Sequence, residues 1–268
     1  MKAVERAIDR VAPAAGVRLR VLKKQLRKDM SMQIIDALVR AGDAVLDVGA
    51  YRGVYTLALA SKVGRGGRVW AIEPFPPNVA AIARATGGRP QVSVCAWAAS
   101  AQPGRETLHV PVYQGHRLGA LATVGSPAGV ATETFEVQLR PLDELCDGAD
   151  GDRPLTFLRC DVVGHEADVL AGAGGCLRRH RPALLLEIEQ RHQERPIQKT
   201  FDDLAALGYE AYFVRGQALF PLAEFDLERD QLALVPEGFV PYGMPAGYVH
   251  YFLFVRPGTD LGSLPLQG

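Results

Sequence analysis

The stretch 44–53, Ala-Val-Leu-Asp-Val-Gly-Ala-Tyr-Arg-Gly, constrains the fold of this chain more than any other. Its apolar run shows no alternation, which is typical of a parallel strand covered on both faces. Gly49 and Gly53 permit a tight turn and the close approach of a ligand, and a helical pattern follows over 54–63. Because a helix start offers unpaired N–H groups, this unit predicts a nucleotide-type crevice at the carboxyl edge of a sheet.

The glycine pattern bears on which nucleotide the crevice takes. A dinucleotide fingerprint is G-x-G-x-x-G with an acid about 20 residues further on, and here only Gly49 and Gly53 are present. Asp47, close to the first glycine, suits a ligand with a cationic amino end better than a diphosphate. S-adenosylmethionine is such a ligand. The alternative is an ordinary strand-to-helix turn in an unrelated α/β fold.

Length, charge and cysteine content limit the classes of protein to which this chain can belong. The 268 residues are enough for one large α/β domain, and the 30 basic and 30 acidic residues cancel, so no global field indicates a nucleic-acid partner. We expect no secretory signal and no transmembrane segment, because no uncharged run approaches the roughly 20 residues that cross a bilayer. A cytoplasmic location follows as an expectation. We expect all four cysteines to be reduced thiols, mostly buried: Cys95, Cys146, Cys160 and Cys176.

Helical and strand patterns alternate along most of the chain. The expected helices cover 32–39, 54–63, 79–84, 141–145, 167–177 and 201–207. The expected strands of the main sheet cover 45–48, 68–73, 91–99, 155–160, 182–189, 209–214 and 248–255. This order predicts a parallel sheet with right-handed crossovers. We expect one domain, 41–268, with insertions at 101–140 and 216–247, either of which could cover the site.

Residues 1–40 are expected to form a helical extension before this domain. The first 30 residues carry nine Lys or Arg and three acids. They could act as a basic arm for an anionic surface or an acidic substrate. The interpretation that we favour is a solvated helical segment that packs on the domain or on the partner in a homodimer.

Two acids stand at the ends of predicted strands. Glu73 ends the second strand, where a carboxylate can accept two hydrogen bonds from a ribose diol; the alternative is a surface acid before a proline-rich loop. Asp161 ends the fourth strand, at the border of the crevice. It could orient a hydroxyl, act as a general base or hold a divalent cation, or it could cap the following helix.

Further candidates for proton transfer follow the fourth and fifth strands. Glu187 and Glu189 share one strand face, and His192 follows closely. An acid and a histidine at a strand end could deprotonate a hydroxyl, because the ordinary pKa of histidine is near 6.5. His165 has the same chemistry. Both histidines could also be simply solvated. No histidine cluster has zinc-ligand spacing.

The motifs, taken together and in order, resemble the FkbM family of S-adenosylmethionine-dependent methyltransferases. The matching segments are Val45 to Gly53, Ala71 to Pro74 with Asn78, Pro141 to Leu145, Asp161 to Glu166 with Val169 and Leu170, and Arg181-Pro182 through Glu189. The resemblance covers roughly residues 40–215. Two departures stand out: Val163 replaces a glutamate that the family usually has, and Arg159-Cys160-Asp161 replaces Lys-Ile-Asp.

The resemblance implies a class I methyltransferase fold, a Rossmann-like three-layer sandwich with a seven-stranded, mostly parallel sheet whose last strand is antiparallel. It also implies O-methylation of a hydroxyl on a sugar, glycan or natural product. The implied cofactor-binding residues are Asp47, Gly49, Ala50, Tyr51, Gly53, Glu73, Pro74, Asn78, Ala98 and Ser100. The candidate catalytic residues are Asp161, His165, Glu189 and His192. A divalent metal is compatible with Asp161 but is not predicted.

Two other function classes stay open on the sequence. Val163 is compatible with a non-catalytic binding or partner domain that has kept the fold. A nicotinamide-dependent oxidoreductase is disfavoured by the missing third glycine.

Overall fold

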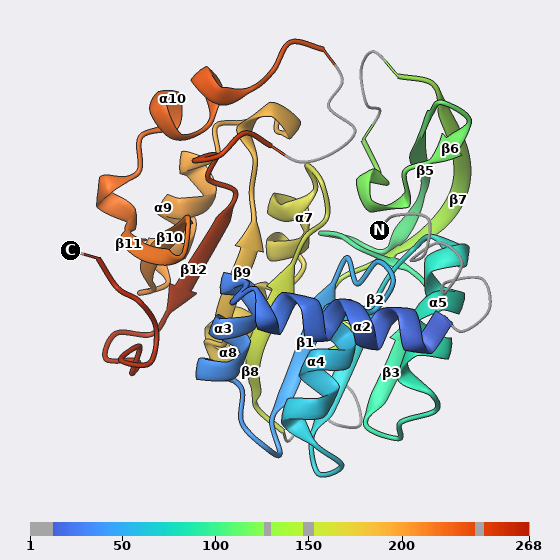
Figure 1. Cartoon of the computed structure of the whole chain (residues 1–268), viewed down its shortest axis with the longest axis horizontal. Coiled ribbons are helices and arrows are strands. Elements are labelled where there is room, and N and C mark those ends of the chain that lie inside the picture. Colours follow the sequence, from blue (N-terminus) through green and yellow to red (C-terminus); the bar gives the residue numbers. More distant parts are fainter. Residues whose placement is uncertain (1–12, 126–129, 147–152, 239–243, 268) are drawn as a thin grey trace.

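The computed structural model describes residues 13–125, 130–146, 153–238 and 244–267. Within these ranges, the main sheet has eight strands in the order β11-β10-β12-β9-β8-β1-β2-β3 (Figure 1). Their bounds are β1 (Ala44–Val48), β2 (Arg68–Ile72), β3 (Val92–Cys95), β8 (Leu155–Cys160), β9 (Ala183–Glu187), β10 (Glu210–Arg215), β11 (Ala218–Pro221) and β12 (Tyr251–Val255).

The expected topology is present, with one strand more than predicted. Neighbouring strands from β3 to β9 are parallel, and β12 is antiparallel to both β9 and β10. The additional strand, β11, forms a hairpin with β10. The hairpin turn contains Gly216 at φ 63°, a conformation that glycine adopts without steric cost.

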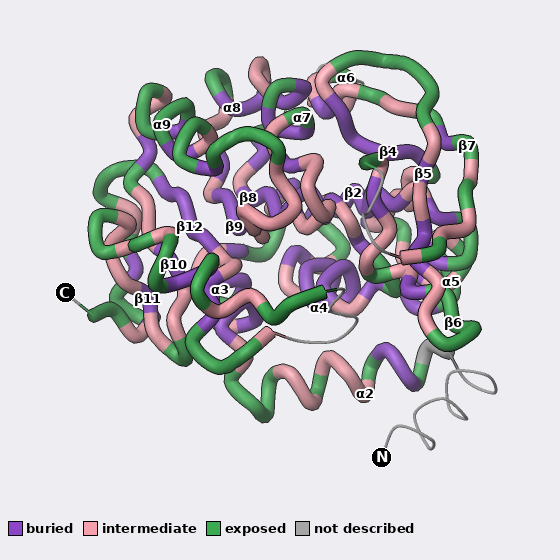
Figure 2. Tube along the Cα trace, turned by 90° about the horizontal axis from the view of Figure 1, so that it is seen from above, coloured by how far each residue is buried: buried purple, intermediate pink, exposed green. Residues whose placement is uncertain are grey.

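Helices cover both faces of the main sheet (Figure 2). One face carries α3 (Met30–Leu38), α4 (Val54–Val63) and α5 (Pro76–Thr86), and the other carries α6 (Asp143–Cys146), α7 (Glu166–Ala171), α8 (Gly174–His180) and α9 (Gln198–Ala206). A further helix, α2 (Pro13–Leu26), lies outside α4 and α5. The helices of the described segments are all too short or too polar to cross a membrane.

The two faces of the sheet explain which residues form the core. Leu46 and Val48 of β1 pack on the side of α7, α8 and α9, and Val45 packs on the side of α3 and α4. Both sides of β1 are therefore buried, which is why its sequence shows no alternation. Asp47 shares the face of Val45 and is fully buried.

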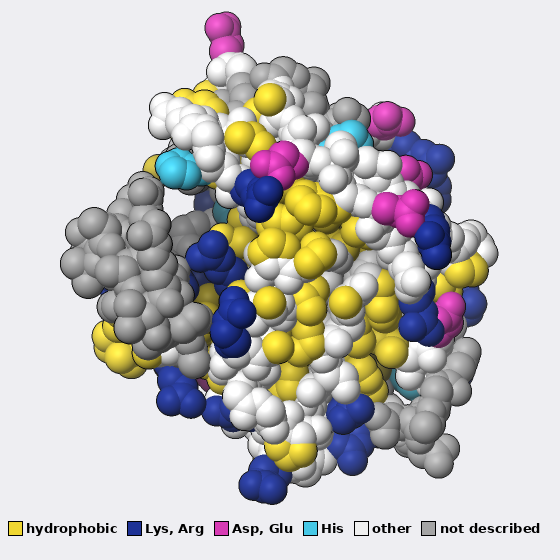
Figure 3. Space-filling model, turned by 90° about the vertical axis from the view of Figure 1, so that its right-hand side faces the viewer, with side chains coloured by type: hydrophobic (Ala, Val, Ile, Leu, Met, Phe, Trp, Pro, Cys, Tyr) yellow, Lys and Arg dark blue, Asp and Glu magenta, His cyan; other side chains and the backbone are white. Residues whose placement is uncertain are grey.

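The insertion at 101–140 builds a separate small sheet in the order β4-β7-β5-β6. Its strands are β4 (Ala98–Ala99), β5 (Gly104–Tyr113), β6 (His116–Arg117) and β7 (Thr132–Arg140). The prediction of one strand over 91–99 is therefore wrong, because β3 pairs with β2 whereas β4 pairs with β7. Figure 3, which views the molecule from this side, shows a central hydrophobic area with basic and acidic side chains around it.

The helix expected over 167–177 is also two elements, α7 and α8. Gly172 lies between them, where an added Cβ would be 2.0 Å from the carbonyl oxygen of Ser100. The close approach of these two backbones requires glycine, and glycine weakens a continuous helix.

The expectation of four reduced cysteines is wrong for two of them. Cys146 at the end of α6 and Cys176 in α8 form a disulfide, with their Cα atoms 6.0 Å apart. Cys95 and Cys160 are free. The two bonded residues are 30 positions apart in sequence, so only the packing of α6 against α8 brings them together.

Beyond β11 the chain forms α10 (Leu227–Asp230) and two short 3-10 helices, Leu222–Glu224 and Leu232–Leu234. Gln231 is fully buried here, and its side-chain amide donates to the carbonyl oxygens of Ile188 and Val249 at 2.9 and 2.8 Å. These bonds connect this segment to the ends of β9 and β12. The division of the chain at residue 40 stays a prediction, and residues 1–12 lie outside the described ranges.

Candidate active site

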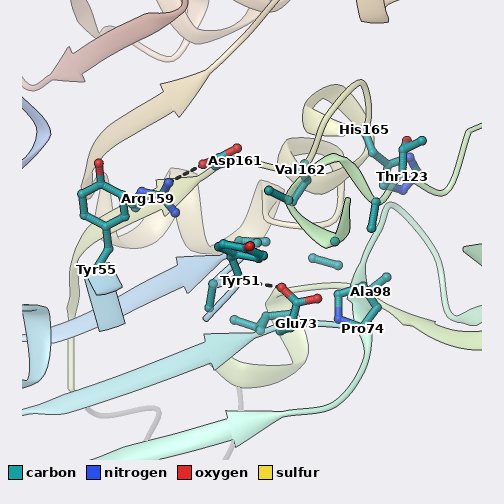
Figure 4. A pocket seen from close by; sticks show the side chains of 18 of the residues that line it. Tyr51, Tyr55, Glu73, Pro74, Ala98, Thr123, Arg159, Asp161, Val162 and His165 are labelled. Atoms are coloured by element: carbon teal, nitrogen blue, oxygen red, sulfur yellow. Dashed lines mark hydrogen bonds and ion pairs between the residues drawn. The ribbon is translucent and has the colours of Figure 1, made fainter. Parts of the chain in front are cut away.

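A cavity of about 290 Å³ lies at the carboxyl ends of β1, β2 and β8 (Figure 4). Eight of the residues singled out from the sequence line it: Gly49, Ala50, Tyr51, Glu73, Pro74, Ala98, Asp161 and His165. Six others do not line it: Asp47, Gly53, Asn78, Ser100, Glu189 and His192. The insertion at 101–140 also contributes to the wall through Leu108 and 119–124, whereas no described residue of 216–247 does so.

Gly49 sits where the ends of β1 and β8 meet. Its φ is +74°, and an added Cβ would lie 1.9 Å from the carbonyl oxygen of Asp161. The amide of Asp161 donates to Val48 O at 3.0 Å. A side chain at position 49 would therefore separate the two strand ends that form the floor of the cavity. Gly53 begins α4 with φ 82° and faces Ile82 of α5.

The Glu73 carboxylate is buried and held by backbone amides. Its Oε2 accepts from Tyr51 N at 2.8 Å, and its Oε1 accepts from Phe75 N at 3.0 Å. A carboxylate has about four lone-pair sites, and Tyr51, Phe75 and Asn78 use three of them, so capacity for one further donor remains. Burial raises the pKa of Glu73 to about 7, against the hydrogen bonds that favour its charged form. Asn78 is one of these donors, and its amide also donates to Gly119 O at 3.2 Å.

Arg159 connects two carboxylates below and beside the cavity. Its guanidinium donates to Asp47 Oδ1 at 3.1 Å and to Asp161 Oδ2, and it lies 4.0 Å from the ring centre of Tyr55. Asp47 also accepts from Thr56 Oγ1 at 2.6 Å. Asp47 therefore supports Arg159 from within the core, while Asp161 is partly exposed and lines the cavity.

Glu187 lies next to Asp161 at the end of β9. Burial, and then the neighbouring carboxylates of Asp161 and Glu189, raise the pKa of Glu187 well above its ordinary value. These effects favour the neutral form of Glu187, and of the two carboxyl groups it is Asp161 that pairs with Arg159 and lines the cavity.

His165 lies on the other side of the cavity, near Thr123 and Ala98 (Figure 4). Its Nε2 is 3.0 Å from Ser100 Oγ, and its Nδ1 is 3.5 Å from Asp168 Oδ2. Burial lowers its pKa although Asp168 opposes this shift. His165 occupies the N-cap position of α7. Asp161 therefore does not cap this helix.

Glu189 and His192 lie away from the cavity wall. The Glu189 carboxylate accepts from Arg191 Nε at 2.8 Å, and His192 Nε2 is 3.8 Å from Glu189 Oε1. Glu189 is thus engaged in an ion pair, and it acts on Glu187 electrostatically, as Asp161 also does.

The model of the methyltransferase FkbM domain matches residues 47–212, a range that holds most of the cavity wall. The chain belongs to the FkbM methyltransferase family. It is therefore placed among the S-adenosylmethionine-dependent methyltransferases. No curated protein matches the chain.

Two solved structures of methyltransferases are similar to this chain. The O-methyltransferase TomG from Streptomyces achromogenes is 12% identical, with a TM-score of 0.50 and 96% of each chain covered. The methyltransferase FkbM from Methylobacillus flagellatus KT is 16% identical, with a TM-score of 0.47. The alignment covers 91% of this chain and 55% of the Methylobacillus chain. At such identities the similarity to TomG shows a common fold.

Val163, which replaces the usual FkbM glutamate, has a structural role in this chain. Its backbone has φ 25°, and its carbonyl oxygen accepts from Thr123 Oγ1 at 2.7 Å. The turn after β8 is thereby tied to the insertion at 101–140. Across the described residues there is no group of three or more His, Cys, Asp and Glu side chains that could hold a metal ion.

Five residues that line the cavity of this FkbM methyltransferase were not predicted to do so from the sequence: Arg20, Lys24, Tyr55, Thr123 and Arg159. Arg159 had a usable signal, because a charged residue inside a buried apolar strand needs a buried partner. Arg20 and Lys24 are one helical turn apart in α2 and share a helix face, but the sequence does not show where that face points.

Proposed function

We propose that this protein is an O-methyltransferase that transfers the methyl group of S-adenosylmethionine to a hydroxyl of a sugar, glycan or natural-product small molecule. The observation that carries the proposal is the position of Glu73 and Asp161 in one cavity. One carboxylate suits the ribose of a nucleoside donor, and the other suits the proton of an acceptor hydroxyl.

The residues present fit the donor. Beside its bonds from Tyr51, Phe75 and Asn78, Glu73 keeps acceptor capacity for a ribose hydroxyl. Pro74, Ala98 and Leu108 provide an apolar wall beside it, which suits the faces of an adenine ring. Gly49 leaves the backbone open to close approach of the ligand. When bound, S-adenosylmethionine supplies an activated methyl group on a sulfonium.

Asp161 is the proposed general base. As the bond between the acceptor oxygen and the methyl carbon forms, the carbon–sulfur bond breaks and its electron pair stays on sulfur. The hydroxyl proton passes to the Asp161 carboxylate, which Arg159 holds in place. Most of the rate is expected from orientation of the two reactants, because holding them in line removes the entropy cost of their encounter.

The acceptor class rests on the family and on one structural relative. TomG takes part in tomaymycin synthesis, so the fold serves natural-product O-methylation in that protein. Segment 119–124 of the insertion lines the cavity with small side chains, among them Gly119, Ala120 and Ala122. This leaves space beside the donor site for a second molecule.

Calorimetry with S-adenosylmethionine, S-adenosylhomocysteine and NAD tests the donor site. We expect the first two to bind and NAD not to bind; absence of binding by both S-adenosyl compounds would refute the proposal. A panel of hydroxylated acceptors then tests turnover. Asp161→Asn should lower turnover by about 100-fold or more while cofactor affinity changes little. Unchanged turnover would remove Asp161 from the mechanism, and binding without any turnover would favour a non-catalytic domain.

A further inference from the structure

Helix α2 contributes two cations to the cavity, although it precedes the family-matched range 47–212. Arg20 and Lys24 line the wall together with Val54 and Tyr55 of α4. The helix is held there by apolar contacts of Val17 and Val21 with α4 and α5. Figure 2 shows α2 along the outside of α4. Its basic face is therefore directed by packing toward the cavity.

Lys24 is positioned by two side chains and retains a donor. Its Nζ donates to Asp29 Oδ2 at 2.6 Å and to Tyr55 Oη at 2.7 Å. Burial disfavours the ammonium, but Tyr55 and Asp29 outweigh this and raise the pKa of Lys24 above its ordinary value. An ammonium has three N–H donors, so a charged donor is left for a ligand.

The two ends of the cavity differ in chemistry (Figure 4). Pro74 and Ala98 lie at the apolar end, beside Thr123 and His165, and Tyr55, Arg159 and Asp161 lie at the other. Lys24 donates to Tyr55 Oη at that charged end, and Arg20 lies one helical turn before Lys24 in α2. Glu73 stands between the two ends. A nucleoside bound through its ribose at Glu73 would place its base at the apolar end. Its charged amino-acid end would then extend toward α2.

We propose that Arg20 and Lys24 of α2 bind the α-carboxylate of the methionine part of S-adenosylmethionine. Asp47 and Asp161 balance the charge of Arg159, and Arg20 and Lys24 add further positive charge to the cavity wall from α2. The extension is thereby a part of the cofactor site and not only a support for it. This inference rests on the cofactor assignment proposed above.

The test compares two nucleosides that differ by one group. S-adenosylhomocysteine carries the α-carboxylate, and its decarboxylated analogue, 5′-deoxy-5′-(3-aminopropylthio)adenosine, lacks it. Calorimetry on the full chain should show that the wild type prefers S-adenosylhomocysteine by about tenfold or more, as expected for hydrogen bonds between charged groups. If neither nucleoside binds, the proposed function fails. If both bind equally, only the role of α2 fails.

The variants Arg20→Gln and Lys24→Gln test whether the preference for S-adenosylhomocysteine over the analogue comes from α2. Each should weaken S-adenosylhomocysteine by about tenfold and leave the analogue within about twofold of its wild-type affinity. Arg18→Gln is the matched control, because Arg18 is an exposed cation of the same helix that does not line the cavity. Lys24→Gln could also loosen α2, which would weaken both nucleosides alike. An equal loss for both nucleosides in both variants, or no loss, would overturn the inference.

Discussion

At the scale of single residues, the site depends on charged groups that the fold has removed from water. Glu73 is 4% exposed, and burial raises its pKa to about 7. Glu166, also buried, has its pKa raised to about 7 for the same reason, although Gly164 N and Gln193 donate to it. Two carboxyl groups near the cofactor cavity therefore titrate in the neutral range, where an exposed glutamate would be fully ionised.

The raised pKa of Glu73 predicts pH-dependent cofactor binding. In the proposed function the ionised carboxylate accepts a hydrogen bond from the ribose, and this form is lost as the pH falls through about 7. Affinity for S-adenosylhomocysteine should therefore be constant above about pH 8 and fall by up to about tenfold per pH unit below about pH 6.5. Calorimetry across this range measures it. Glu73→Gln should bind weakly and independently of pH, whereas a dependence unchanged in that variant would assign it to another group such as Glu166.

Arg159 predicts a stability effect. Its side chain is 3% exposed, and Asp47 beside it is fully buried. Arg159→Met should cost about 3–5 kcal/mol in the free energy of unfolding, because it leaves a buried carboxylate without its cation. Denaturant unfolding measures this. Arg105→Met is the control, since the Arg105–Glu136 pair is exposed and should cost no more than about 1 kcal/mol. Equal losses would contradict a special role for Arg159.

At the scale of elements, α4 has the bounds that the sequence predicts, Val54–Val63, and β1, Ala44–Val48, begins one residue before the predicted strand. The reason is local, since a mostly apolar run, two glycines and a helical pattern each favour one conformation. The predictions over 91–99 and 167–177 were wrong because contact with a backbone segment distant in sequence determines where the strand and the helix end. The pairing of β4 with β7 ends one strand, and the approach of Ser100 to Gly172 ends one helix.

The meeting of β1 and β8 at Gly49 predicts a large effect of one methyl group. Gly49→Ala would place a Cβ 1.9 Å from Asp161 O at a φ of +74°. We expect a loss of about 3 kcal/mol or more in the free energy of unfolding and a loss of nucleoside binding. Gly42→Ala is the control, because Gly42 also has a positive φ but nothing within 4 Å; it should cost about 1–2 kcal/mol. Denaturant unfolding and calorimetry measure both, and similar losses in the two variants would contradict the role of the close approach.

At the scale of the whole molecule, the cavity is assembled from parts of the chain that are far apart in sequence. The turn after β1, the end of β2, the end of β8 and the insertion at 101–140 all contribute, and α2 completes the wall. The disulfide between Cys146 and Cys176 joins α6 to α8 on the face of the main sheet that α6 to α9 cover. Neither arrangement is visible in sequence spacing.

The disulfide predicts a redox dependence of stability. The bond closes a sequence separation of 30 residues, so its reduction should cost about 3–4 kcal/mol, mainly by freeing the unfolded chain. Thermal unfolding with and without a reductant measures this. Cys146→Ser should unfold at the temperature of the reduced wild type in both conditions. Cys95→Ser, at a free cysteine, should keep the wild-type response to reductant; a wild type that ignores the reductant would contradict the prediction.

The sequence by itself determined the α/β alternation, the glycine turn after β1, and the acids that end β2 and β8. These features come from local patterns and from family motifs, and carboxyl strand ends meet at one edge whatever the details. Only the tertiary structure decided that Asp47 faces the core, that Arg159 joins it to Asp161, and that Arg20 and Lys24 reach the cavity. Which partner a charged side chain finds depends on packing between segments up to 112 residues apart, and local patterns do not contain that information.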